Sequence, residues 1–237
     1  MSRRPPWALL GILIWVVSTA PGALAEPAPA ETASAEVPAA TPPAPDAPRP
    51  ASELQASDCV DRLHEALLGV MKNSETLGYQ GRYDQLAPAL VELFDLAFMA
   101  EKSVGRHWKT ASPEDRAILV DTFSRYTVAN YAGRFSSYSG QHFETLQEEP
   151  SARGTLLVRT RLVDPDGGDV VNLDYRLRSV GGSWRIIDVY LNGIVSELAL
   201  RRSEYSSMIK REGFQALLVA LDERIESLAE APTDSAS

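Results

Sequence analysis

Histidine is the side chain most often used for proton transfer and metal binding near neutral pH, and this sequence contains three. His64, His107 and His142 are far apart, and no two of them have the spacing of a metal-binding pair. The sequence also lacks a glycine loop that cradles phosphate and a nucleophile elbow. We therefore expect three surface or turn histidines in a protein that is not an enzyme and needs no metal or other cofactor.

Two further groups of residues could carry chemistry. Asp164, Asp166 and Asp169 suggest a calcium loop, but the distal glutamate of such loops is missing, and Pro and Gly between them favour a hairpin turn. Cys59 is the single thiol, so no intramolecular disulfide can form. Its acidic neighbours Asp58 and Asp61 are expected to raise its pKa, which predicts an unreactive thiol.

A cluster of cations near the C-terminus is suited to meet an anionic group. It consists of Arg201, Arg202, Lys210 and Arg211. Three glutamates stand among these cations at the spacing of helical ion pairs, namely Glu197, Glu204 and Glu212. A solvated helix face is therefore at least as good an interpretation as an anion site.

A sheet must position part of these groups. Beyond residue 142 the period of the apolar residues changes from about 3.6 residues, which is typical of a helix, to 2 residues, which is typical of a strand. Segments 155–163, 170–180 and 184–191 alternate apolar and polar residues between short turns, and 143–148 is a candidate first strand. This predicts an antiparallel meander with one dry face. Strict alternation places Ile187 and Val189 on that face, and Ile186 and Asp188 on the other.

Helices are predicted before and after the meander along the chain. They begin at Ser57, after Gly78 and Gly81, at Asp95, and at Ser112-Pro113, with the longest running to about Ser137. Two more follow Gly193 and are separated near Gly213. Because the dry face needs cover, we predict an α+β fold in which several helices pack on one face of a curved antiparallel sheet.

The ends of the chain have the composition of non-domain segments. Arg3 and Arg4, an apolar run and Ala23-Leu24-Ala25 predict a cleaved signal peptide over 1–25, with a retained anchor as the less favoured alternative. Residues 26–52 are a predicted disordered Pro/Ala-rich linker, 53–230 a single domain and 231–237 a flexible tail. The net charge of −9 makes nucleic acid an unsuitable partner.

Several segments taken together resemble the toluene-tolerance family, which includes the MlaC-type periplasmic phospholipid carriers. They are 94–100 (FDLAFMA), 105–108 (GRHW), 123–131, 184–189 (WRIIDV), Gly193 and 202–205 (RSEY). The segment 194–200 (IVSELAL) is more similar to the hopanoid-biosynthesis-associated, HpnM-like branch. The resemblance implies a lipid-binding domain over 53–230, whose ligand is a phospholipid or a hopanoid-like lipid. It also implies exchange with inner- and outer-membrane lipid-transport complexes.

The resemblance further implies an apolar ligand cavity between sheet and helices, with the head group near its mouth. The expected lining residues are Phe98, Trp108, Phe123, Tyr126, Val158, Leu173, Tyr175, Ile187 and Val189. Arg201 and Arg202 are the candidates for contact with the head group. Periodicity alone equally allows these faces to pack on one another, as in a non-carrying interaction or assembly module beside a lipid-transport or hopanoid machinery.

Deletion of residues 26–50 is expected to leave the thermal midpoint nearly unchanged, because this segment has little apolar surface to add to a core. Thermal unfolding of the shortened chain beside the exported chain measures the effect. A drop of several degrees would contradict the assignment as a linker.

Overall fold

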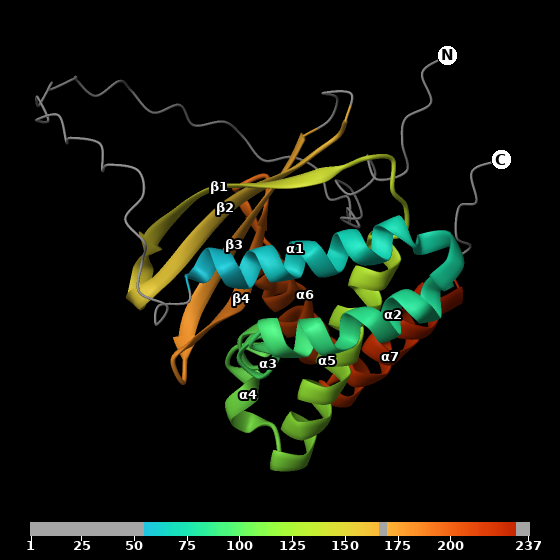
Figure 1. The fold of residues 1–237 in the computed structure, drawn as a ribbon. Helices are drawn as coiled ribbons and strands as arrows, with labels where there is room; N and C mark the ends of the chain where they lie inside the picture. The colour runs from blue at the N-terminus through green and yellow to red at the C-terminus, as the bar shows by residue number, and fades with distance from the viewer. Residues whose placement is uncertain (1–54, 166–169, 231–237) are drawn as a thin grey trace, which may run out of the picture.

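The structure is a computed structural model that describes residues 55–165 and 170–230 (Figure 1). The predicted signal peptide, linker and tail lie outside the described residues, as do Asp166 and Asp169 of the predicted hairpin turn. Within the described part of the chain, no helix is long and apolar enough to cross a membrane.

Helices come first in the chain, then strands, then helices again. The first group is α1 (Ala56–Lys72), α2 (Ser74–Leu93), α3 (Leu96–Val104), α4 (His107–Thr110) and α5 (Pro113–Arg134). The strands are β1 (His142–Ser151), β2 (Thr155–Val163), β3 (Val170–Val180), β4 (Ser183–Leu191) and the short β5 (Val195–Ser196). The last helices are α6 (Glu197–Glu212) and α7 (Phe214–Glu230). The predicted α+β fold is confirmed.

The caps explain where the helices begin. Asp95 accepts a hydrogen bond from the backbone N–H of Phe98 at 3.1 Å, and Ser112 caps α5 through Asp115 at 3.0 Å, both as predicted. The predicted cap at Ser57 was wrong, because α1 begins one residue earlier with a capping box formed by Gln55 and Asp58. The expected turn at Gly78 and Gly81 is a kink at Gly78 alone, whose positive φ of 58° suits glycine.

The five strands form one antiparallel sheet in the order β1-β2-β3-β4-β5, which confirms the predicted meander. The strand β5 pairs with the end of β4, and Phe94 forms a parallel bridge with Ile186 farther along. Both cover part of the free edge of β4. At the opposite edge, β1 has a register shift between Thr145 and Gln147, which is a β-bulge at Leu146.

A second bulge corrects the predicted faces of β4. Arg176 is opposite Asp188 and Leu177 is opposite Ile186, so Ile187 has no partner on β3. The extra residue reverses the alternation, and Ile186 joins Val189 on the face that the helices cover. The main apolar cluster accordingly contains Ile186 and Val189, whereas Ile187 is buried outside it.

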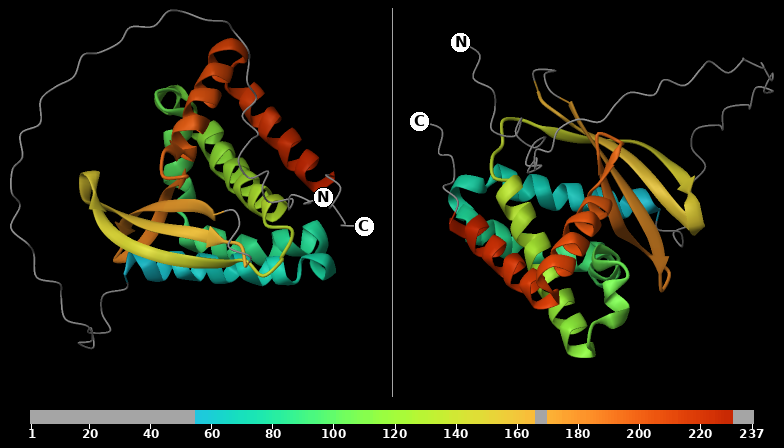
Figure 2. Two further views of the ribbon diagram at one scale, coloured as in Figure 1. Left: turned by 90° about the horizontal axis from the view of Figure 1, so that it is seen from above. Right: turned by 180° about the vertical axis from the view of Figure 1, so that it is seen from behind.

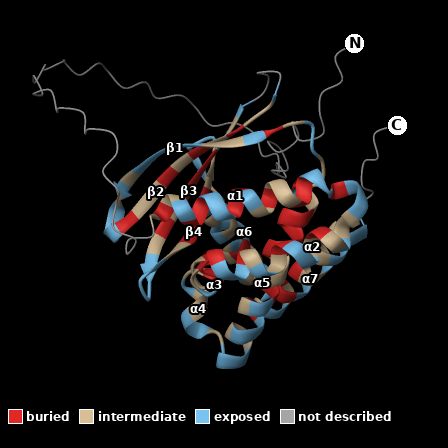
Figure 3. Cartoon of the chain, viewed as in Figure 1, coloured by how far each residue is buried: buried red, intermediate tan, exposed pale blue. Residues whose placement is uncertain are grey.

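The helices cover one face of the sheet, and the core lies between the two layers (Figures 1 and 2). The helix α1 lies against β1, β2 and β4, while α3 and α6 contact β4. The helix α5 lies behind this layer against α2, α3 and α7. Buried residues gather where the helices face the sheet and each other (Figure 3).

His64 was wrongly expected at the surface. Only 4% of this residue of α1 is exposed, and its ring stacks on Phe143 with 3.9 Å between ring centroids. Its Nε2 atom lies 3.3 Å from the hydroxyl of Tyr175 on β3. Burial lowers the pKa of His64 from 6.5 to about 3, so the imidazole is a neutral part of the core. His142 is exposed as expected, and His107 is partly buried.

The replacement His64→Gln is expected to reduce the loss of stability in acid. An unfolded chain takes up this proton near pH 6.5, whereas the folded chain does so at about pH 3, so stability falls as the pH is lowered between these values. At about pH 4.5 this difference amounts to about 2–3 kcal/mol in the free energy of unfolding. Urea unfolding of wild type and variant near neutral pH and at this lower pH measures it.

The control is His142→Gln, which removes an exposed histidine and should keep the acid sensitivity of the wild type. Equal acid sensitivity of His64→Gln and wild type would show that His64 does not stay neutral in the fold.

Candidate functional site

The apolar interior between sheet and helices contains most of the side chains expected to line a cavity. Five are buried in the main cluster, namely Phe123, Val158, Leu173, Tyr175 and Val189, whereas Ile187 is buried outside it. Trp108 and Tyr126 are partly buried and pack against the main cluster. Phe98 is partly exposed and carries Arg178 and Lys102 over its ring, at 4.2 and 5.0 Å from the centroid. The structure therefore brings seven of the nine into or against the interior, with Phe98 at its border and Ile187 outside it.

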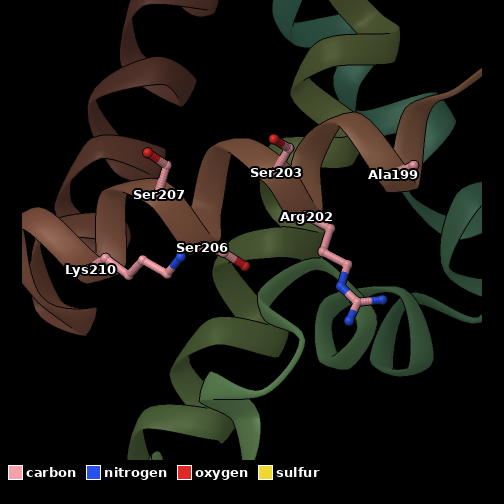
Figure 4. Close-up of a pocket in the computed structure, with 6 residues that line it drawn as sticks. All are labelled: Ala199, Arg202, Ser203, Ser206, Ser207 and Lys210. Atoms are coloured by element: carbon pink, nitrogen blue, oxygen red, sulfur yellow. The ribbon is translucent and has the colours of Figure 1, made fainter.

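These side chains pack closely in this structure. Val158 and Tyr175 face each other across β2 and β3, and both are almost fully buried. The hollow drawn in Figure 4 lies instead on α6, and none of the nine expected residues lines it. An internal lipid cavity stays a prediction.

Arg201 is the cation at the edge of this interior. Its side chain is only 11% exposed, and its guanidinium lies over the rings of Phe123 and Tyr126, at 5.3 and 5.2 Å from their centroids. Its acidic neighbour Glu197 is 3.5 Å away, one helical turn earlier. Glu197 also accepts a shorter bond of 2.8 Å from Arg134 of α5. The carboxylate is thus shared, and Arg201 is only weakly paired.

Two hydrogen-bond donors in this region are buried without a partner among the described residues. They are the Nη1 atom of Arg201 and the hydroxyl of Tyr205, and Tyr205 is 1% exposed. Burial opposes the charge of Arg201, yet Tyr205 and Glu197 raise its pKa above the ordinary value, so the guanidinium stays charged. Burial raises the pKa of Tyr205, so its hydroxyl keeps its proton. Both groups can donate to an acceptor that enters the interior.

Asp188 of β4 fixes the helix that carries these donors. One carboxylate oxygen accepts from the N–H of Val189 at 2.9 Å and of Leu198 at 3.1 Å, and the other from the hydroxyl of Ser196 at 2.6 Å. The Ser196 hydroxyl in turn caps α6 by accepting from the N–H of Ala199 at 2.9 Å. Burial raises the pKa of Asp188, and these three hydrogen bonds oppose that effect.

The two arginines expected to meet a head group lie on different faces of α6. Adjacent residues of an α-helix differ by about 100° in direction, so Arg202 is exposed while Arg201 lies against α5. Arg202 lies over Gly105, where an added Cβ would be 2.9 Å from its Nε. The sequence could have distinguished the inward arginine from the outward one. Arg201 is four residues from Tyr205, so the two share the apolar face of the helix.

The described residues contain no group of three or more His, Cys, Asp or Glu that could hold a metal ion. Cys59 is buried, and its Sγ lies 3.7 Å from the carbonyl oxygen of Leu93. The pKa of its thiol is raised to about 11, and the direction of this shift agrees with the prediction. The main cause is burial rather than the neighbouring aspartates.

The fold and the site define a class of α+β protein in which one antiparallel sheet and a helical layer enclose an apolar interior with a charged arginine at its edge. Comparison with known families is more specific. The family model described as MlaC protein matches residues 61–223, and the chain belongs to the MlaC family.

Two relatives are informative. The intermembrane phospholipid transport system binding protein MlaC of Haemophilus influenzae is 21% identical over 137 residues, which are 56% of this chain and 64% of that protein. This chain therefore matches less than two thirds of that curated relative. A solved phospholipid-binding protein from Ralstonia solanacearum, in complex with a phospholipid, has a TM-score of 0.65 and 22% identity over 75% of this chain and 100% of that one. The likeness supports the fold.

The replacement Tyr205→Phe is expected to stabilise the protein by about 1 kcal/mol, because it removes a buried hydroxyl that has no partner among the described residues. The matched replacement Tyr175→Phe should destabilise it by a similar amount, since it leaves His64 without its hydrogen-bond partner. Urea unfolding of both variants measures the two effects. Destabilisation by Tyr205→Phe would show that its hydroxyl is bonded in solution.

Proposed function

We propose that this protein is a phospholipid carrier of the MlaC kind. It takes the acyl chains of one lipid between sheet and helices and pairs the lipid phosphate with Arg201. Family membership supports a phospholipid as cargo, and so do the two relatives, one named for phospholipid transport and the other for phospholipid binding. No covalent step is involved, because the protein holds the lipid and releases it unchanged.

The observation that carries the proposal is a pair of buried donors without a partner among the described residues, the Nη1 atom of Arg201 and the hydroxyl of Tyr205. A phosphate diester offers anionic oxygens, and guanidinium binds such oxygens through short, charge-assisted hydrogen bonds. Without lipid, Arg201 rests against the faces of Phe123 and Tyr126, which stabilise a cation less strongly than a phosphate does. A bound phosphate would satisfy both donors.

The acyl chains have an apolar destination next to this pair. Val158, Tyr175 and Val189 of the sheet face the same interior as Phe123 of α5. They pack closely here, so loading requires the sheet and the helices to separate. Burial of each methylene contributes about 0.8 kcal/mol, and a chain of many methylenes can offset the cost of that separation.

The location and partners belong to the same proposal. The signal-like sequence of residues 1–25 supports export to the periplasm, where the protein would exchange lipid with inner- and outer-membrane lipid-transport complexes. A hopanoid-like lipid is the alternative cargo, supported by the sequence of 194–200. The two cargoes differ in their need for Arg201, because a polycyclic lipid without phosphate offers no anionic partner.

The replacement Arg201→Met should weaken phospholipid binding roughly tenfold to a hundredfold, because a charge-assisted hydrogen bond contributes about 1.5–3 kcal/mol. The measurement is native mass spectrometry of delipidated protein mixed with detergent-solubilised phospholipid. Arg202→Met is the matched control, since it makes the same change one residue away on the exposed face of α6.

Equal loss in both variants would contradict the inward role of Arg201. Undiminished binding of phospholipid by Arg201→Met would remove the phosphate contact from the proposal. A wild-type protein that takes up neither phospholipid nor hopanoid in this assay would favour the interaction module without cargo.

A further inference from the structure

The outer face of α6 carries a hollow that the carrier role does not use. Its volume is about 490 Å³, and it opens to solvent (Figure 4). The lining residues come from successive turns of α6 and are Ala199, Arg202, Ser203, Ser206, Ser207 and Lys210. This face is turned away from Arg201 and Tyr205. Two cations, with three serine hydroxyls between them in the chain, distinguish the hollow chemically.

Both cations of the hollow are without an acidic partner in the described part of the chain. The three glutamates of α6 are each paired with other cations. These pairs are Glu197 with Arg134 and Arg201, Glu204 with Arg224, and Glu212 with Arg211. The expected pairing of glutamates along the helix therefore does not neutralise Arg202 or Lys210. Their charges are available to an external anion.

The neighbouring start of α4 adds to the same positive region. The pKa of His107 is lowered by burial and, to a smaller extent, by the cations Arg106 and Lys210, which places Lys210 near this turn. The whole chain has a net charge of −9, so this region differs in sign from the protein as a whole. A negatively charged surface would repel most of the molecule and attract this face of α6.

Exposed aliphatic side chains lie near the start of the same helix. Ile194, in the turn before β5, is 84% exposed, and Leu200 of α6 is 47% exposed. Basic residues close to exposed aliphatic residues are typical of surfaces that bind the interface of a membrane. The hydroxyls of Ser203 and Ser206, with a guanidinium and an ammonium group, are suited to the oxygens of a phosphate. An acidic protein could use the same cations and hydroxyl groups, and the exposed Ile194 and Leu200 favour a membrane over such a partner.

We propose that this basic hollow docks the protein on membranes that contain anionic phospholipids. Arg202 and Lys210 each bind the phosphate of a lipid in the bilayer, assisted by the serine hydroxyls between them in the chain, while Ile194 and Leu200 rest among the head groups. The docking goes beyond the carrier role and does not depend on it, because it uses the outer face of α6. It would hold the helix that carries Arg201 against the membrane surface.

The test is flotation of the full chain, purified after export, with two kinds of vesicle. One kind contains phosphatidylcholine alone, and the other also contains phosphatidylglycerol. The wild type should float with the anionic vesicles at low salt and be released at high salt, because salt screens exposed charges. The double variant Arg202→Gln/Lys210→Gln should bind them roughly 25-fold more weakly, at about fivefold for each cation near an anionic surface.

The matched control is Lys72→Gln/Arg153→Gln, which removes the same charge from exposed positions on α1 and the β1–β2 turn. It should keep most of the binding. Equal weakening by the two double variants, equal binding to both vesicles or no binding to either would overturn the proposal. Binding to inorganic phosphate or to an acidic protein without binding to vesicles would also overturn it. Lipid uptake from detergent should be normal in Arg202→Gln/Lys210→Gln, which separates this proposal from the carrier role.

Discussion

The arrangement of the molecule depends on the carboxylate of Asp188, which joins the last long strand to the helix that follows it. One oxygen holds backbone N–H groups of Val189 and Leu198, and the other holds the hydroxyl that caps α6. A buried carboxylate is costly, and these bonds offset the cost. Because this contact fixes where α6 begins, it also fixes which residues of α6 face inward. A shift by one residue that put Leu200 in the place of Arg201 would remove the cation from the interior.

The interior combines two kinds of packing with different consequences. The part between α1 and the sheet is closed and satisfied, with His64 bonded to Tyr175 and stacked on Phe143. The part between α5 and α6 contains the Nη1 atom of Arg201 and the hydroxyl of Tyr205, which have no partner among the described residues. Unsatisfied buried donors reduce stability. Without lipid, the fold is therefore least stable where the proposed ligand would enter. Local opening is favoured at such a region rather than near His64.

Local patterns predicted the elements well and their mutual contacts less well. The bounds of β2 and β3 and the break at Gly213 follow from alternation and from glycine, which are properties of short segments. The bulge at Ile187 depends on how β4 pairs with β3, so alternation placed Ile186 on the wrong face. The burial of His64 depends on Phe143 and Tyr175, which are distant in sequence. Arg201 could be recognised from its helical phase with Tyr205, whereas its missing partner is a property of the tertiary structure.

The free edge of β1 affects how the protein behaves at high protein concentration. An edge strand offers unpaired N–H and C=O groups to any other strand, and regular exposed edges promote aggregation. The bulge at Leu146 interrupts the regular spacing of these groups, and Pro150 removes one donor farther along. Glu148 adds negative charge to the same strand, whereas Glu149 is paired with Arg159 of β2. Two copies that meet edge to edge could not form a continuous ladder, which protects the sheet against assembly into fibrils.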